Sequence, residues 1–329
     1  MDWSASTPPI LNIVVPCYNE EEVIGETIKQ LSVVMVNLIQ SKLVSPSSLI
    51  MFVDDGSRDR TWELIEHHHL INQYVTGLKL ARNVGHQNAL LAGLMAAKEQ
   101  ADCVISIDAD LQDDLGTIEK FVVEFHKGAE IVYGIRQSRE SDTFFKRNTA
   151  LGFYRLMARM GAKIEYNHAD FRLMSKRALM QLEKFKEVNL FLRGIVPLIG
   201  FKTVKVQYDR HERFAGESKY PLKKMIGFAL DGITSLSVTP IRIVTLAGFL
   251  FFIVSLLVGV YIIISKVSGT TVSGWSSLMA SVWFIGGIQL VSLGLIGEYI
   301  GKIYKEVKHR PLYIIEKELT AASKEMGQS

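Results

Sequence analysis

Short apolar runs alternate with segments of helical periodicity over the first 135 residues of the chain. The runs are Ile10–Val15, Leu49–Val53, Val75–Leu80, Cys103–Ile107 and Ile131–Ile135. Each run is too short for a helix and rich in β-branched residues, which predicts buried strands. Strands separated by helical segments predict an α/β fold, with a mostly parallel sheet and right-handed crossovers.

Two later segments extend this pattern. Thr203–Tyr208 is predicted to be another strand. The segment Asp170-Phe-Arg-Leu is predicted to begin a helix, for which Asp170 could be no more than the N-cap.

Three of the predicted strands end in acidic or polar clusters, namely Asn19/Glu20, Asp54/Asp55 and Asp108/Asp110. In open α/β sheets, ligands bind outside the carboxyl ends of the strands. Acidic residues in a first helical turn also favour the helix dipole, so part of the first cluster needs no functional explanation. Three clusters on one edge of a sheet nevertheless predict a pocket.

Asp108 and Asp110 stand two residues apart, so they point to the same side if the chain is extended, with Ala109 pointing away. Paired carboxylates repel unless a cation neutralises them, and such ligands suit Mg²⁺ or Mn²⁺ together with phosphate oxygens. The alternative is a turn in which an aspartate caps a helix that begins near Asp114. The chain contains neither G-x-x-x-x-G-K-[ST] nor a G-x-G-x-x-G after any of these strands, so a diphosphate would be held by a metal and cationic side chains.

The last third of the chain has a membrane pattern. Ile243–Ser265 is 23 residues long and uncharged, which is enough to span roughly 34 Å of a bilayer. Leu278–Gly297 is a second uncharged run. The alternative is a pair of buried core helices. Two spans would place the first 240 residues and the end of the chain on the same side of the membrane.

Basic residues near the predicted spans are concentrated on that side, with Lys266 alone on the other. They are Lys219, Lys223, Lys224, Arg242, Lys302, Lys305, Lys308 and Arg310. By the positive-inside rule, both termini are expected to be cytoplasmic. The predicted organisation is a cytoplasmic α/β domain (residues 1–219), an amphipathic interfacial helix (220–240), two transmembrane helices (241–300) and a cytoplasmic tail (301–329).

Composition narrows the class of protein further. A formal net charge of +3 gives no reason to expect a nucleic-acid partner, and the two cysteines indicate neither a disulfide nor a zinc site. The N-terminus lacks the pattern of a cleaved signal peptide. Small residues in the second predicted span are compatible with a homo-oligomer.

Five motifs occur in a recognisable order: IVVPCYNEEE, VDDGSRDRT, DADLQD, DFRL and GESKY, followed by the apolar hairpin. Over nearly the whole chain this arrangement resembles the family 2 glycosyltransferases of GT-A fold that act on polyprenyl phosphates. The resemblance is to the bacterial bactoprenol glucosyltransferases first and to dolichyl-phosphate mannose synthase more distantly. Two segments depart from the pattern: His86-Gln87 stands where relatives often carry Lys-Glu, and Asn167-His-Ala stands where a glycine is common.

The resemblance implies a role for each motif residue. The residues implied to bind the nucleotide sugar are Pro16, Tyr18, Glu20, Asp54, Asp108, Arg213, Ser218 and Lys219. The implied metal ligands are Asp108, Asp110 and Gln112, and the cations implied to bind the acceptor phosphate are Arg136 and Arg147. Asp170 is the implied catalytic acidic residue near the reacting centre. For the basic segment 144–160 the alternative is a solvated helix face.

The implied activity is an inverting transfer of a hexose to undecaprenyl phosphate at the cell (inner or plasma) membrane, for cell-envelope glycosylation. UDP-glucose is the expected donor, and Mg²⁺ or Mn²⁺ the expected cofactor. One alternative is a processive polysaccharide synthase, which would carry a Q-x-x-R-W motif that the chain lacks. Another is a membrane protein that only binds a nucleotide sugar and regulates a partner.

Overall fold

The computed structural model describes residues 7–136, 168–188, 191–209, 239–268 and 274–320. These residues belong to two compact units. One comprises the described residues up to 209 together with 311–320, and the other comprises the described residues between 239 and 310.

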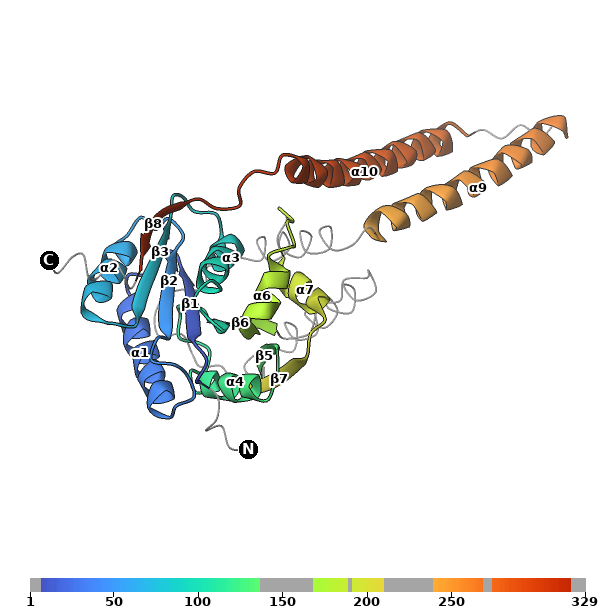
Figure 1. Cartoon of the computed structure of the whole chain (residues 1–329). Helices are drawn as coiled ribbons and strands as arrows, with labels where there is room; N and C mark the ends of the chain where they lie inside the picture. The colour runs from blue at the N-terminus through green and yellow to red at the C-terminus, as the bar shows by residue number, and fades with distance from the viewer. Residues whose placement is uncertain (1–6, 137–167, 189–190, 210–238, 269–273, 321–329) are drawn as a thin grey trace. The chain divides into compact units, whose positions relative to one another are not determined.

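The first unit is built on one sheet, in which eight strands are described, in the order β7-β5-β6-β4-β1-β2-β3-β8 (Figure 1). Their bounds are β1 Leu11–Cys17, β2 Leu49–Asp54, β3 Val75–Leu80, β4 Cys103–Ser106, β5 Ile131–Arg136, β6 His168–Ser175, β7 Thr203–Tyr208 and β8 Ile315–Leu319. Strands β4, β1, β2 and β3 are parallel neighbours, and β5 is parallel to β7. Strand β6 is antiparallel to β4 and β5, and β8 to β3, so the sheet is mixed.

Helices cover both faces of this sheet. One face packs against α1 (Ile24–Gln40), α2 (Thr61–Ile71) and α4 (Thr117–His126), and the other against α3 (His86–Ala97), α6 (Lys176–Leu182), α7 (Leu192–Ile195) and the 3₁₀ turn η1 (Val196–Ile199). Side chains of β1 alternate between the two resulting cores, and every residue of this strand is buried. That is the expected environment of a central parallel strand with helices on both faces.

The Asp170-Phe-Arg-Leu segment is a strand, so the predicted helix start is wrong. Phe171 and Leu173 face one core, while Asp170 and Arg172 lie on the opposite side of β6 with Met174. This is a period of two, which a strand satisfies and a helix does not. The helix begins only at Lys176, where the Ser175 hydroxyl accepts a bond from the amide of Ala178 and caps it.

The chain returns to the sheet near its C-terminal end. Strand β8 pairs with β3, the Ile314 carbonyl accepts a hydrogen bond from the amide of Ala81 at 2.9 Å, and Leu319 is buried in the core. Ion pairs from Lys317 to Glu66 and from Lys79 to Glu316 fix the same edge. Part of the predicted tail is therefore the last strand of the catalytic sheet.

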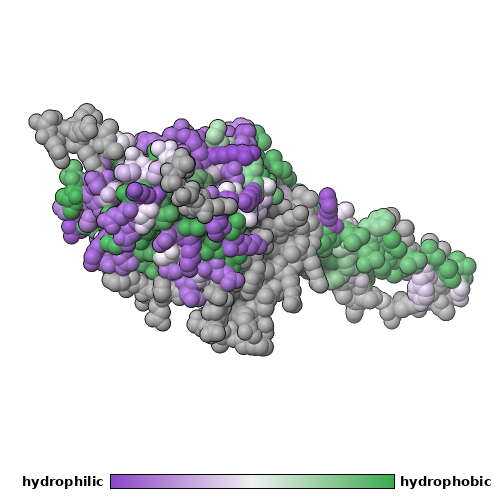
Figure 2. Space-filling model, turned by 60° about the horizontal axis from the view of Figure 1, so that its bottom comes forward, coloured by the Kyte–Doolittle hydropathy of each residue, from purple (hydrophilic) through white to green (hydrophobic). Residues whose placement is uncertain are grey.

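The second unit contains α9 (Thr239–Val267) and α10 (Trp275–Val307), of 29 and 33 residues. Among the described residues, Phe284–Val307 is a helical stretch long and apolar enough to cross a membrane, and Pro240–Phe251 is a shorter apolar helix. Leu257 and Leu290, for example, are 65% and 72% exposed. Figure 2 shows this apolar surface, which contrasts with the polar surface of the first unit. Exposed apolar surface of this extent marks a site of membrane or protein contact.

Candidate active site

All eight described strands have one end at the same edge of the sheet, including β8, which is antiparallel to β3 and begins beside the end of β3. The parallel neighbours β1 to β4 end there, β6 begins there because it is antiparallel to β4, and β5 and β7 end there because they are antiparallel to β6. The three polar clusters predicted from the sequence therefore follow strands that end on one edge, and Asp170 enters that edge from the start of β6.

The loops after β1 and β2 are bonded to each other. The amide of Asn19 donates to the Ser57 hydroxyl at 2.9 Å, and the amide of Glu20 donates to the Thr61 hydroxyl at 2.9 Å. Asn19 adopts a left-handed conformation with φ of 52°, which asparagine tolerates better than most residues. Contacts of Pro16, Tyr18 and Glu20 with a nucleotide remain predictions.

Asp54 and Asp55 organise these loops through backbone amides. Asp54 accepts the Ser57 amide at 3.3 Å with both oxygens, and Asp55 accepts the amides of Val84 and Gly85 at 2.7 and 2.9 Å. Burial raises the pKa of both carboxyls, and these hydrogen bonds oppose the rise. Asp54 is fully buried, so its observed role is to shape the loop, and its predicted contact with the nucleotide stays a prediction.

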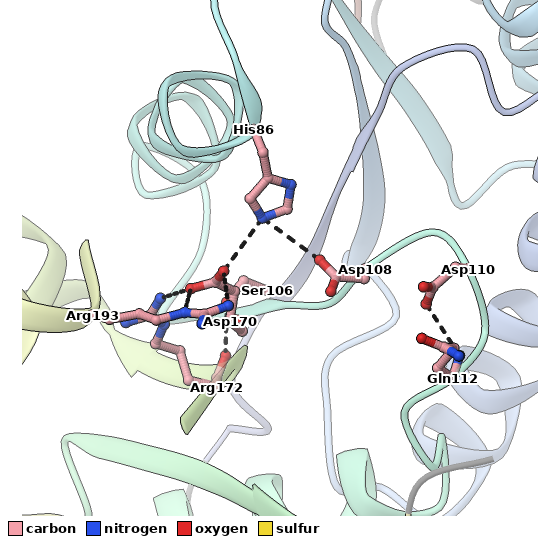
Figure 3. Close-up of polar contacts among 8 residues, drawn as sticks. All are labelled: His86, Ser106, Asp108, Asp110, Gln112, Asp170, Arg172 and Arg193. Carbon is pink, nitrogen blue, oxygen red and sulfur yellow. Dashed lines mark hydrogen bonds and ion pairs between the residues drawn. The ribbon is translucent and has the colours of Figure 1, made fainter. Parts of the chain in front are cut away.

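The loop after β4 carries the predicted metal ligands. Strand β4 ends at Ser106, so Asp108 and Asp110 lie in the loop that follows it, with Asp110 in a turn, and Leu111 has φ of 56°. The Asp108 carboxylate lies 3.6 Å from Nε2 of His86, and the Asp110 carboxylate accepts the amide of Gln112 at 3.2 Å (Figure 3). Burial, with the charges of nearby aspartates, raises the pKa of Asp108 to about 6, although His86 opposes the rise.

Two other aspartates of this loop have structural partners. The Asp114 carboxylate accepts the amide of Gly116 at 2.9 Å and the hydroxyl of Thr117 at 3.1 Å, at the start of α4. The Tyr208 hydroxyl donates to Asp113 at 2.5 Å. The carboxylate that bonds the start of α4 is therefore that of Asp114, two residues before the N-cap Gly116.

Asp170 is held by cationic side chains from three elements (Figure 3). Its Oδ1 lies 2.7 Å from Nη2 of Arg172 in β6, its Oδ2 lies 3.0 Å from Nη2 of Arg193 in α7, and Nε2 of His86 in α3 lies 3.4 Å from Oδ2. The Ser106 hydroxyl donates to the Asp170 carbonyl and ties β6 to β4. Burial alone would raise the pKa of Asp170, but Arg193, His86 and Arg172 hold it well below its usual range.

His86 joins the two acidic groups of the site. Burial lowers the pKa of its imidazole, but the hydrogen bond to Asp170 and the charge of Asp108 outweigh this and raise it to about 9. At neutral pH the cluster therefore combines two carboxylates, one of them fully ionised, with three cationic groups. Such a site can orient an anionic substrate and stabilise charge that develops next to it.

The other predicted site residues are only partly within the described chain. Arg136 is the last residue of β5, at the edge of the sheet where Asp108 and Asp170 lie, but the placement of its side chain is not described. Arg147, Arg213, Ser218 and Lys219 lie outside the described residues, as do the predicted helices 144–160 and 220–240. Conversely, no sequence pattern singled out Arg193, and His86 stood out only as a departure from the family pattern.

The donor set fits a hard divalent cation. Mg²⁺ is usually bound through one or two carboxylates together with substrate phosphates, and Asp108 and Asp110 supply two such groups on one turn. Among the described residues there is no group of three or more His, Cys, Asp or Glu side chains arranged for a metal. The arrangement therefore suits a cation that is bound together with a diphosphate substrate.

The α/β fold and its acidic edge agree with an enzyme class that the sequence comparison identifies: the chain belongs to glycosyl transferase family 2, which its residues 12–183 match. Residues 239–303 match the GtrB C-terminal hairpin. The protein is thus a glycosyltransferase with a GT-A catalytic domain, as the sequence predicts. The hairpin and the apolar helix indicate association with a membrane.

The relatives of this chain cover nearly its whole length. It is 61% identical over 311 residues to the uncharacterized glycosyltransferase YkoT of Bacillus subtilis, covering 94% of this chain and 92% of that protein. It is 40% identical to the bactoprenol glucosyl transferase of Shigella phage SfV, covering 94% and 98%. Among solved structures, glucosyl-3-phosphoglycerate synthase from Mycobacterium tuberculosis is similar with a TM-score of 0.46 and 17% identity, covering 69% of this chain and 77% of that one.

Proposed function

We propose that this glycosyltransferase transfers glucose from UDP-glucose to undecaprenyl phosphate, with inversion at the anomeric carbon and with Mg²⁺ or Mn²⁺. The observation that carries the proposal is the cluster at this edge of the sheet, where Asp108 and an ionised Asp170 share His86 and where Asp170 also binds two arginines. The choice of a lipid acceptor is supported by the similarity to bactoprenol glucosyl transferases over almost the entire chain.

The acceptor needs little activation. The second pKa of a phosphate monoester is about 6, so a lipid phosphate is mostly dianionic at neutral pH and is already a nucleophile. Attack of its oxygen on the anomeric carbon forms one bond while the bond to the nucleotide diphosphate breaks. A single displacement of this kind inverts the anomeric configuration.

Asp170 is better suited to orient groups than to remove a proton. Its low pKa makes it a weak base, since Arg172 and Arg193 already stabilise the carboxylate. A fixed anion at this position can instead hold the surrounding cations, including His86, in place for the acceptor. Arg136 and Arg147 are proposed to bind the acceptor phosphate.

The donor diphosphate is proposed to lie at the turn after β4. Asp108, Asp110 and Gln112 would hold the cation, and its chemistry when bound is to neutralise charge on the departing diphosphate. Arg213, Ser218 and Lys219 are proposed to contact the donor phosphates. Pro16, Tyr18, Glu20 and Asp54 are proposed to surround the nucleotide.

The proposed location is the inner or plasma membrane, with two spans and both ends of the chain in the cytoplasm. Strand β8 belongs to the same sheet as β1 to β7, so the chain between Tyr208 and Ile315 must cross a bilayer an even number of times. Two crossings by α9 and α10 satisfy this requirement. The basic residues Lys305, Lys308 and Arg310 lie after the second crossing, where the positive-inside rule places the cytoplasm.

The experiment that tests the proposal offers the purified full-length protein a panel of nucleotide sugars with undecaprenyl phosphate. We expect one hexose per lipid, identified by mass, with UDP-glucose as the preferred donor and an inverted anomeric configuration by NMR. Chelation of divalent cations should abolish transfer, and Mg²⁺ or Mn²⁺ should restore it. Absence of any lipid product would contradict the proposal, and a product carrying many hexoses would favour a processive synthase.

A further inference from the structure

Two dipeptides that are far apart in the sequence form a bracket around Asp170. His86-Gln87 begins α3, and Leu192-Arg193 begins α7. The side-chain oxygen Oε1 of Gln87 accepts the amide of Leu192 at 2.9 Å, across a separation of 105 residues. The other residue of each dipeptide, His86 in the first and Arg193 in the second, contacts the Asp170 carboxylate.

Helix α7 depends on other parts of the chain for its orientation. It has only four residues, and its N-cap, Phe191, makes no side-chain capping bond. A single helical turn is not stable by itself. Its position depends on burial of Leu192 and Ile195 in the core, and the bond from its first amide to Gln87 is the described side-chain bond to its backbone.

Arg193 makes the contact that sets the plane of the Asp170 carboxylate. Arg172 approaches Oδ1 alone, at 2.7 Å, whereas Arg193 reaches Oδ1 through Nε at 3.3 Å and Oδ2 through Nη2 at 3.0 Å. A fork that contacts both oxygens fixes the orientation of a carboxylate more narrowly than a single contact does. The side chain of Arg193 is 33% exposed, whereas that of Arg172 is 2% exposed, so the two-point contact stands at the open side of the cluster.

We propose that Gln87 is a positioning residue of this enzyme: by holding the first amide of α7 it places Arg193 across both oxygens of Asp170 and so orients Asp170 for glycosyl transfer. This inference rests on the proposed function, in which Asp170 faces the reacting centre. The described bond of Gln87 is to the amide of Leu192, so its effect on Asp170 passes through Arg193.

A matched pair of substitutions separates the hydrogen bond from the volume of the side chain. Gln87→Met keeps the length and removes the acceptor, and it should lower kcat by about 10-fold to 100-fold, the range that small misplacements in an active site produce. KM for the nucleotide sugar should stay within about 2-fold, since the donor-binding turn is untouched. Gln87→Glu keeps an acceptor oxygen and should retain most of the wild-type kcat.

A double-mutant cycle with Arg193→Met tests the route of the effect. If Gln87 acts through Arg193, then the double variant should transfer sugar no more slowly than Arg193→Met alone, and Arg193→Lys should recover part of the loss. Losses in kcat that multiply in the double variant would overturn the proposal, because independent sites add in free energy.

A structural readout separates this proposal from the proposed function. A structure of Gln87→Met should show Arg193 displaced from at least one Asp170 oxygen, and an unchanged Arg193 contact would overturn the positioning role whatever the substrate. If the wild-type protein transfers no sugar to undecaprenyl phosphate, the proposed acceptor is wrong, while this displacement can still be observed. Gln87→Ala provides the same structural test if the Met variant does not fold.

Discussion

The carboxylates at the end of β2 and the carboxylate at the start of β6 are equally buried but differ in charge state. Asp54, Asp55 and Asp170 are 0%, 3% and 4% exposed. The pKa of Asp54 and Asp55 is raised, whereas the pKa of Asp170 is held well below its usual range. The partners account for the difference, since the first two carboxyls accept backbone amides while the third meets two guanidinium groups and an imidazole.

This difference in partners explains why buried carboxylates at the same edge of the sheet have opposite pKa shifts. Here the backbone amides do not fully offset the cost of burying Asp54 and Asp55, whereas the positive charges around Asp170 more than offset the cost of burying it. The observed bonds of Asp54 stabilise the loop after β2, and those of Asp55 connect this loop to the segment after β3. Asp170 remains an anion beside the partly exposed His86 and Asp108, where a substrate can reach the cluster.

The largest effect is expected from Asp170→Asn. The substitution leaves Arg172 and Arg193 without their buried counter-charge, which typically costs about 3 to 5 kcal/mol of stability. Transfer should fall by at least about 100-fold, because the orientation of the cationic groups is lost. Urea unfolding and a lipid-product assay measure the two effects.

The exposed residue Glu119 supplies the matched control for that substitution. Glu119→Gln removes one carboxylate from the surface, so its stability should lie within about 0.5 kcal/mol of the wild type. Near-normal turnover by a folded Asp170→Asn variant would show that the charge of Asp170 is not needed for transfer, and the proposed difference in role between Asp170 and the carboxylates after β2 would be wrong.

The second largest effect, a loss of stability, is expected when β8 is removed. Strand β8 supports the segment after β3, which is bonded to Asp55 and leads to His86 beside Asp170. The Ile314 carbonyl and the Asp55 carboxylate both bond the segment from Ala81 to Gly85, which leads directly into His86. A chain truncated after Tyr313 loses these β8 contacts and exposes the site of Leu319, a loss of about 2 to 3 kcal/mol.

The control for this truncation ends at Thr320 and keeps β8. The shorter chain should unfold at lower urea concentration and show faster amide exchange in residues 81–86. If exchange in this segment is equal in the two truncated proteins, then β8 does not support the active-site loop.

Much of this edge could be predicted from the sequence, because local patterns determine it. The apolar runs correspond to β1 to β5, and the polar clusters that follow them stand at one edge because parallel strands end together. The prediction was wrong at Asp170-Phe-Arg-Leu, where a short period of two was taken for the start of a helix. It was incomplete at β8, whose first four residues are exposed and mostly charged and give no apolar signal.

The cluster around Asp170 could not be assembled from local pattern. Arg193 stands 23 residues from Asp170, on a helix of one turn whose place is set by tertiary packing. His86 reaches the same carboxylate from α3. An arginine within the apolar segment Phe-Leu-Arg-Gly-Ile was the one available signal, since charged residues in buried surroundings are usually paired.

A smaller effect is expected from Asp55→Asn. The carboxylate accepts two amides with two oxygens, and asparagine can accept only one while its amino group faces the other donor. One unsatisfied amide costs about 1 to 3 kcal/mol, partly offset because the buried charge is removed. Stability should decrease while kcat changes less than in Asp170→Asn. A fall in kcat as large as that of Asp170→Asn, with little loss of unfolding free energy, would instead indicate that Asp55 takes part in the reaction.

The smallest effect concerns pH. The folded-state pKa of Asp170 lies below its unfolded value of about 3.9, so its contribution to stability is present above the unfolded pKa and is lost as pH falls through the folded pKa. The stability difference between wild type and Asp170→Asn should therefore be largest from about pH 5 to pH 6.5 and should shrink in stronger acid. It should also shrink as pH rises from about 6.5 toward 9, because Asp170 helps to raise the pKa of His86 to about 9 and that contribution to stability is lost as the imidazole deprotonates. Asp54 and Asp55 have raised pKa values, so their ionisation in the unfolded chain reduces stability as pH rises above about 4. Urea unfolding of both proteins across this range measures the difference, and a difference that grows steadily from pH 5 to pH 8 would mean that Asp170 is not held as a carboxylate by its arginines.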